Sequence, residues 1–253
     1  MYTINNLPYL DLSSHVDLQG LELIEKDIIF GIVKSRGFIS EGCANTKNCY
    51  DQAIPSLLMT QWKDYLQDPS NPNYQYYKEL QFVVRDCLMF NRYVGKYQQM
   101  GQVLYLRNTV DNGRHGIWSK SYSDGCSDRP GYANFPALRE WINNCKIFDE
   151  IGRILFFFNA PGEPHSIHKD TFTGHPDHFI LINLNTDRKT VFVLDNDGTR
   201  HTLDSKVSVF DVRNYHGSEG KDFYSWTLRI DGIYNKEWAE SIGIWDHFKP
   251  IGP

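Results

Sequence analysis

Residues 164–170, Pro-His-Ser-Ile-His-Lys-Asp, are the most informative part of the sequence, and residues 214–217, Asn-Tyr-His-Gly, supply a further histidine much later in the chain. His168 and Asp170 are two residues apart, so on an extended strand both side chains leave the same face. The distance along the chain to His216 leaves room for several strands that wrap round and return. We therefore predict that one short segment and one distant strand bring three polar side chains together.

The three side chains form a pattern with a known chemistry. Two histidines and one carboxylate on one side of a metal, with the opposite positions open, are the facial arrangement of non-haem Fe(II) oxygenases. His168, Asp170 and His216 are therefore the candidate metal ligands. Ligation by His165 together with His168 would need helical or loop geometry, and the preceding prolines disfavour a helix. The alternative interpretation is that these are surface-loop histidines and that His216 is structural.

A candidate anion-binding residue follows His216 at a short interval. Residues 224–231 alternate between apolar and polar side chains, as expected of a strand that points Arg229 into a barrel. A planar guanidinium binds a carboxylate through two parallel charge-assisted hydrogen bonds, which lysine cannot reproduce. Thr227 shares its face and can add a hydroxyl contact. The alternative is an ordinary ion pair with Asp231 or Asp211.

Taken together, the H-x-D motif, the distal histidine, the arginine and the strand-rich interval resemble the Fe(II)/2-oxoglutarate-dependent dioxygenases over residues 135–232. The resemblance implies that Fe(II) binds to His168, Asp170 and His216, and that 2-oxoglutarate chelates the iron while Arg229 and Thr227 hold its far carboxylate. It further implies that O2 is used to hydroxylate an unactivated C–H bond of a substrate, with release of succinate and CO2.

Further pocket residues are expected on the strands that would line the barrel. Asn159 and His178 are candidates for contacts with the co-substrate, and for each an ordinary hydrogen-bonded barrel residue is an equally good interpretation. Arg153, Asn183 and Arg107 are candidates for binding a polar substrate. Each of them is also a residue type that commonly forms structural ion pairs or hydrogen bonds in a barrel.

The order of elements is most similar to that of aspartyl/asparaginyl or free amino acid hydroxylases. The expected substrate is therefore a small polar molecule, an amino acid or a derivative, which is free, carrier-bound or part of a protein side chain. Related halogenases lack the carboxylate ligand, so Asp170 favours hydroxylation, desaturation or cyclisation. Two other classes stay open: a cupin-type metalloenzyme that does not use 2-oxoglutarate, and a non-catalytic metal-binding or interaction module.

Composition narrows the class of protein. The chain has 26 basic and 31 acidic residues and a net charge of -5, which disfavours a nucleic-acid partner. It has no apolar run long enough for a bilayer and no signal-like start, so we expect a cytoplasmic protein with no membrane partner. Its 5 cysteines are irregularly spaced and include no C-x-x-C pair, which indicates reduced thiols. A zinc site at Cys43 and Cys49 is the weaker alternative.

The expected fold class is α+β: a double-stranded β-helix core, the cupin-like jelly roll, with a helical N-terminal half packed on it. Residues 1–100 are expected to be helical and part of the same domain, and their helices are a candidate homodimer surface. Residues 101–253 are expected to form the catalytic core. Periodicity predicts helices over residues 20–33, 54–67, 76–93 and 135–145, and strands over residues 102–107, 152–159, 178–184, 189–194, 206–212 and 223–231.

Overall fold

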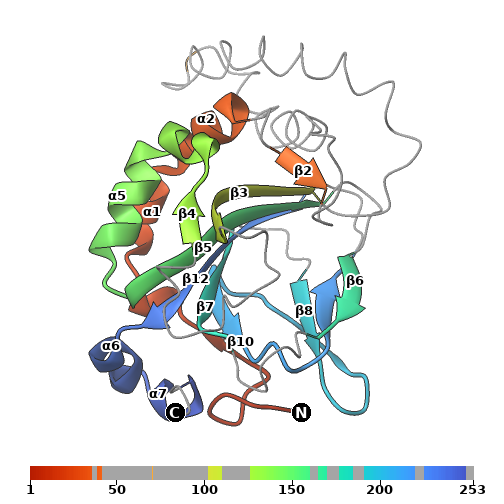
Figure 1. Ribbon diagram of the computed structural model, residues 1–253. Coiled ribbons are helices and arrows are strands. Elements are labelled where there is room, and N and C mark those ends of the chain that lie inside the picture. Colours follow the sequence, from red (N-terminus) through yellow and green to blue (C-terminus); the bar gives the residue numbers. More distant parts are fainter. Residues whose placement is uncertain are drawn as a thin grey trace, which may run out of the picture.

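The computed structural model of the chain describes residues 1–35, 39–41, 70, 102–109, 126–159, 165–169, 177–184, 191–219 and 225–248. The helices predicted for residues 54–67 and 76–93, and the residues Cys43 and Cys49, lie outside these ranges. Within them, two antiparallel sheets face each other, and helices cover the outer side of the larger one (Figure 1). None of the helices in these ranges is long and apolar enough to cross a membrane.

The larger sheet has the strand order β1-β10-β7-β12-β5-β3-β2, with β4 paired to β3. Its strands are β1 (Tyr9–Asp11), β2 (Ile39–Glu41), β3 (Gln102–Thr109), β4 (Cys126–Asp128), β5 (Phe148–Asn159), β7 (Phe179–Asn183), β10 (Val207–Phe210) and β12 (Ser225–Tyr234). The smaller sheet has the order β6-β11-β8-β9. Its strands are β6 (His165–His168), β8 (Val191–Leu194), β9 (Arg200–Thr202) and β11 (His216–Ser218).

The path of the chain between the two sheets defines the architecture. From β5 onward the strands pass back and forth, so that β5, β7, β10 and β12 lie in the larger sheet and β6, β8, β9 and β11 lie in the smaller one. Eight antiparallel strands divided in this way form the double-sheet jelly roll of cupins. The chain has a cupin-like fold. The predicted jelly-roll core is therefore confirmed.

Register assigns the strand residues to two faces of the larger sheet. Leu228 pairs with Phe156 on β5, which in turn pairs with Leu104 on β3, and all three are fully buried. The ring of Phe135 contacts the ring of Phe156 at 5.5 Å, so this face lies under the helices. The covering helices are α1 (Leu18–Leu23), α2 (Glu25–Lys34), the 3-10 helix η4 (Pro130–Asn134) and α5 (Pro136–Asn144).

The opposite face of the larger sheet points toward the smaller sheet. Side chains alternate along a strand, so Thr227, Arg229 and Asp231 lie on this inner face if Leu228 lies on the outer one. Phe210 of β10 contacts His216 of β11 with ring centroids 4.9 Å apart, which places both between the sheets. The polar stripe of β12 predicted from the alternation is therefore inside the barrel, where all three of its residues are buried.

The N-terminal half differs from the prediction. The helix expected over residues 20–33 is present as α1 and α2, which are separated at Ile24. However, the same half also supplies β1 and β2, which extend the larger sheet, so the description of it as helical is incomplete. Each of these strands has three residues, too few for alternation to mark them. The division of the chain at residue 100 stays a prediction.

Candidate functional site

Two of the three predicted metal ligands face each other across a strand pair. His216 of β11 and His168 of β6 are cross-strand partners, and their ring centroids lie 4.5 Å apart. Residues directly opposite in an antiparallel pair project to the same face, so the two imidazoles share one side of the smaller sheet. His216 is only 6% exposed, while His168 is exposed. The structure thus brings together two histidines that are far apart in the sequence.

The third predicted ligand, Asp170, lies outside the described residues, two positions after His168, which is the last residue of β6. Within the described ranges, no group of three or more histidine, cysteine, aspartate or glutamate side chains could hold a metal ion. The full triad therefore stays a prediction, with its two histidines in place.

A backbone carbonyl determines which nitrogen of His216 carries the proton. The Nδ1 atom of His216 lies 3.0 Å from the carbonyl oxygen of Asn214. A carbonyl oxygen can only accept, so Nδ1–H is the donor, and in the neutral ring Nε2 then carries the lone pair. A ligating histidine is held in this way in most metal sites, where its second nitrogen donates to a carboxylate or a carbonyl. The donor chemistry of His216 therefore fits a metal ligand.

Arg229 is 8% exposed and belongs to a buried ion-pair network. Its Nε donates to Asp231 at 2.6 Å, and its Nη2 donates to Asp177 at 3.1 Å. The second oxygen of Asp231 accepts from Nε of Arg153 at 2.5 Å. Burial raises the pKa of Asp231, but the charges of Arg153 and Arg229 outweigh burial and hold that pKa below its usual range. The ion pair with Asp231, the alternative considered for Arg229, is confirmed.

A continuous line of ring contacts joins Arg229 to the paired histidines. The guanidinium lies 4.3 Å above the ring of Phe179. Phe179 contacts Phe210 at 5.1 Å, Phe210 contacts His216 at 4.9 Å, and His216 contacts His168 at 4.5 Å, all between ring centroids. The candidate metal ligands and the candidate carboxylate-binding arginine therefore border one interior, as the resemblance implies, although their roles stay predictions.

The other predicted pocket residues fall into different parts of the barrel. Thr227 is buried on the face of Arg229, and Asn183 is its cross-strand partner on β7, so both line the interior. Asn159 ends β5 opposite Ser225, and the position of its side chain lies outside what the structure describes. Arg107 pairs with Asp128 at 2.8 Å in a cluster that reaches the surface.

His178 does not belong to this site. Its Nε2–H donates to the carbonyl oxygen of Phe248, and its Nδ1 accepts from the backbone N–H of Tyr234 at 3.0 Å. The ring also stacks on Tyr234 with centroids 4.8 Å apart. Burial lowers the pKa of His178 to about 4, against the opposing effect of the Phe248 carbonyl. Because both ring nitrogens have protein partners, we assign His178 to the anchoring of α7 (Trp245–Phe248) and withdraw it from the co-substrate site.

The roles of two residues of the site were missed in the sequence. Asp177, the second partner of Arg229, precedes a buried strand, and its role depends on a cross-strand register that the sequence pattern does not give. Asn214, whose carbonyl orients His216, precedes that histidine by two residues. The signal for Asn214 was its proximity to a candidate ligand, since partners of the second ring nitrogen are a regular part of metal sites.

No family model matches the sequence, and no curated protein matches it. Among solved structures, the chain is similar to a 2OG-Fe(II) oxygenase family oxidoreductase from Burkholderia pseudomallei, with 12% identity, a TM-score of 0.37, and coverage of 68% of this chain and 88% of that one. A prolyl-4-hydroxylase from Pseudomonas putida gives 12% identity, a TM-score of 0.31, and coverage of 83% and 99%.

A cupin domain from Bordetella pertussis gives 13% identity and a TM-score of 0.25, and covers 33% of this chain and 81% of that one. All three TM-scores are low. The fold assignment therefore rests on the strand order and register of this chain, and the site assignment rests on its own side chains.

Proposed function

We propose that this protein is an Fe(II)- and 2-oxoglutarate-dependent oxygenase that hydroxylates a small polar substrate, an amino acid or a derivative of one. The observation that carries the proposal is the cross-strand pair of His168 and His216 inside a cupin-like barrel, with His216 held in the tautomer that a metal ligand needs. Asp170, which follows His168 by two positions in the sequence, completes the facial set in the proposal.

The donor set fits iron better than a closed structural metal. Two neutral imidazoles and one carboxylate on one side leave open positions for a co-substrate and oxygen, whereas structural zinc sites are closed by four protein ligands. Bound iron would supply the activation of oxygen, which no side chain of the barrel can perform. The residues of this chain hold the ligands in place, orient the co-substrate and exclude water from the interior.

Arg229 is the proposed partner of the far carboxylate of 2-oxoglutarate. The contact of its Nη2 with Asp177, at 3.1 Å, is longer than the contact of its Nε with Asp231, at 2.6 Å. A guanidinium has five N–H donors, so one edge can stay on Asp231 while another turns to a ligand. In the proposal an incoming carboxylate competes with Asp177, and removal of the Asp177 charge should tighten co-substrate binding.

A second function is favoured by the same ion pairs. Two arginines and two aspartates in the Arg153–Asp231–Arg229–Asp177 network balance their charges within the protein. Such a network can serve as a structural part of the barrel that binds no anion. The alternative is therefore a cupin-type metalloenzyme that uses the two histidines but not 2-oxoglutarate.

The deciding experiment is an anaerobic titration of the metal-free protein with Fe(II), followed by 2-oxoglutarate, under visible absorption. A charge-transfer band that needs both additions indicates keto acid chelation and supports the oxygenase. Iron binding without the band supports the alternative. If neither binds, both proposals fail.

Single substitutions test the role that the proposal gives to each residue. His216→Ala and Asp170→Ala should each weaken iron binding, because one of three protein ligands is lost. His201→Ala is the matched control, since His201 lies on β9 of the same sheet and pairs with Asp195. Arg229→Lys should raise the 2-oxoglutarate concentration needed while iron stays bound. If Arg229→Lys leaves that concentration unchanged, the role assigned to Arg229 is wrong.

A further inference from the structure

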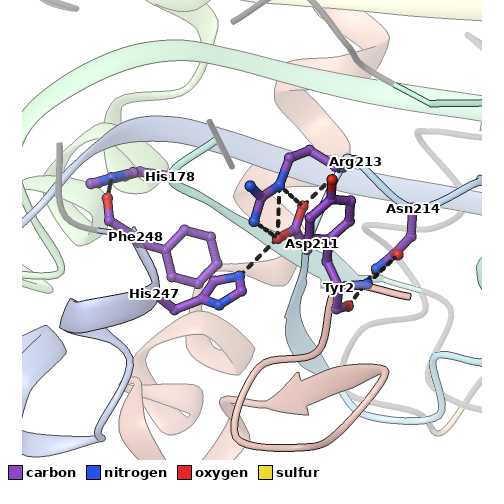
Figure 2. A network of polar contacts seen from close by, with 7 residues as sticks. All are labelled: Tyr2, His178, Asp211, Arg213, Asn214, His247 and Phe248. Atoms are coloured by element: carbon purple, nitrogen blue, oxygen red, sulfur yellow. Dashed lines mark hydrogen bonds and ion pairs between the residues drawn. The ribbon is translucent and has the colours of Figure 1, made fainter. Parts of the chain in front are cut away.

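The connection between β10 and β11, which delivers His216 to the site, is held by residues from both ends of the described chain. It begins at Asp211, which is fully buried and whose carboxylate accepts from Arg213 at 2.6 Å and from Nε2 of His247 at 2.8 Å. His247 belongs to α7, so the last helix reaches directly into this connection (Figure 2). Burial raises the pKa of Asp211, but its bonds with Arg213 and His247 outweigh burial and lower that pKa to about 2.

The other end of the connection is fastened to Tyr2. The side-chain amide of Asn214 accepts from the backbone N–H of Tyr2 at 2.8 Å and donates to its carbonyl oxygen at 2.6 Å. These two hydrogen bonds, which we call the clamp, hold the side chain of Asn214 on the backbone of Tyr2, near the start of the chain. The guanidinium of Arg213 lies 3.9 Å above the ring of Tyr2, so a second contact supports the same clamp (Figure 2).

Asn214 therefore makes one contact through its side chain and another through its main chain. Its side chain is fixed on Tyr2, and its main-chain carbonyl accepts the Nδ1 proton of His216 at 3.0 Å. The direction of that carbonyl depends on the orientation of the Asn214 peptide, which the side-chain clamp restrains. If that carbonyl turned away, its hydrogen bond would no longer favour the Nδ1–H tautomer, and only this tautomer presents Nε2 for ligation.

We propose that Asn214, clamped on Tyr2, is a positioning residue that fixes the tautomer and the ring orientation of His216. The consequence for metal affinity rests on the proposed function, whereas the consequence for the tautomer does not. Loss of a residue that orients a metal-ligating histidine typically weakens metal binding by roughly 10- to 100-fold. Because Asn214→Ala keeps the main-chain carbonyl that accepts from His216, we expect a loss of metal affinity at the lower end of this range, roughly 10-fold.

The first test uses the protein without any metal. Long-range proton–nitrogen NMR of histidine side chains reports which ring nitrogen carries the proton. The wild-type protein should show the Nδ1–H tautomer for His216, assigned by its loss in His216→Ala. In Asn214→Ala the other tautomer should appear beside it. An unchanged Nδ1–H signal in a folded Asn214→Ala protein overturns the proposal.

A second variant removes the clamp from the opposite side. Tyr2→Pro lacks the backbone N–H that Asn214 accepts, while Tyr2→Ala keeps that N–H and loses only the ring over Arg213. Tyr2 is exposed, so neither substitution disturbs the core. We expect Tyr2→Pro to change the His216 tautomer as Asn214→Ala does, and Tyr2→Ala to change it less. If Tyr2→Ala and Tyr2→Pro have equal effects, the ring rather than the clamp does the positioning, and the proposal fails.

The second test measures metal affinity by titration with Co(II), a spectroscopic substitute for Fe(II). Asn214→Ala should weaken binding roughly 10-fold, and the double variant with Tyr2→Pro should be no weaker than Asn214→Ala, because both remove one interaction. Equal affinity in the wild-type and Asn214→Ala proteins counts against the positioning role. If the wild-type protein binds no metal, the proposed function fails, and the tautomer measurement still decides the role of Asn214.

Discussion

His178 should cause the protein to lose stability between pH 6.5 and pH 4. Burial lowers its pKa from 6.5 to about 4, so within this window the unfolded chain binds a proton that the native state excludes. The contribution of the neutral ring is complete above pH 6.5 and is lost as the pH falls toward 4. Each pH unit removes about 1.4 kcal/mol from the free energy of unfolding, so the full window removes about 3 kcal/mol.

The variant His178→Asn removes the titrating ring and retains part of the structure. An asparagine oxygen can still accept from the N–H of Tyr234, but the donor to the Phe248 carbonyl and the ring stack on Tyr234 are lost. A buried carbonyl without a partner costs about 1–3 kcal/mol, and an aromatic pair contributes about 0.5–1.5 kcal/mol. The variant should therefore be about 2–4 kcal/mol less stable at pH 7.

The assay is urea unfolding followed by fluorescence at a series of pH values from 7 to 4.5, for the wild-type protein, His178→Asn, and the surface control His15→Gln. The difference in stability between the wild-type protein and His178→Asn should shrink as the pH falls, by about 1.4 kcal/mol per unit below pH 6.5. The control should follow the wild-type curve. Parallel curves for the wild-type protein and His178→Asn over the whole range would refute the reasoning.

Three further predictions concern the barrel and its candidate metal. Asp231→Asn should destabilise the protein by about 3–5 kcal/mol, measured by urea unfolding, because it leaves the buried Arg229 and the half-buried Arg153 with one partner charge fewer. Gly232→Ala should cost about 1–3 kcal/mol in the same assay, since a Cβ there would lie 2.3 Å from the carbonyl oxygen of Glu150; no loss would mean that β5 and β12 separate easily. Co(II) at 100 times its Kd should stabilise the native state by about 2.7 kcal/mol, seen as a rise in Tm that a chelator reverses, and an unchanged Tm would contradict metal binding.

The strands of the core could be predicted wherever composition or alternation was strong. The apolar run over residues 178–184 became β7, buried on both faces, and the alternation over residues 223–231 became β12. The three-residue strands β9 and β11 gave no such signal. β11 nevertheless contains His216, which was identified from the chemistry of the residue and not from periodicity. The candidate ligand His216 therefore drew attention to β11, although the periodicity of the sequence did not.

The remaining parts depend on relations that the sequence pattern does not contain. The pairing of Arg229 with Asp177 depends on the register of β12 against β7, and one residue of slip would send Arg229 to the other face. The short helix α6 (Lys236–Ser241) was missed although the sequence contains a signal for it. That signal is the capping residue Asn235, whose side chain accepts from the N–H of Trp238 at 2.9 Å. The clamp of Asn214 on Tyr2 joins residues that are 212 positions apart, and no local rule predicts such a contact.

That clamp also determines when the candidate centre can be completed during folding. Its partners are 212 positions apart, and the bond between Asp211 and His247 spans a further 36. Contacts between such distant segments form slowly, because the entropy of closing long loops is lost before the contacts are gained. Strand β1 pairs with β10 over a similar separation, so we expect β1 and the clamp to join last, and on refolding the capacity to bind metal to return after the other strands have paired.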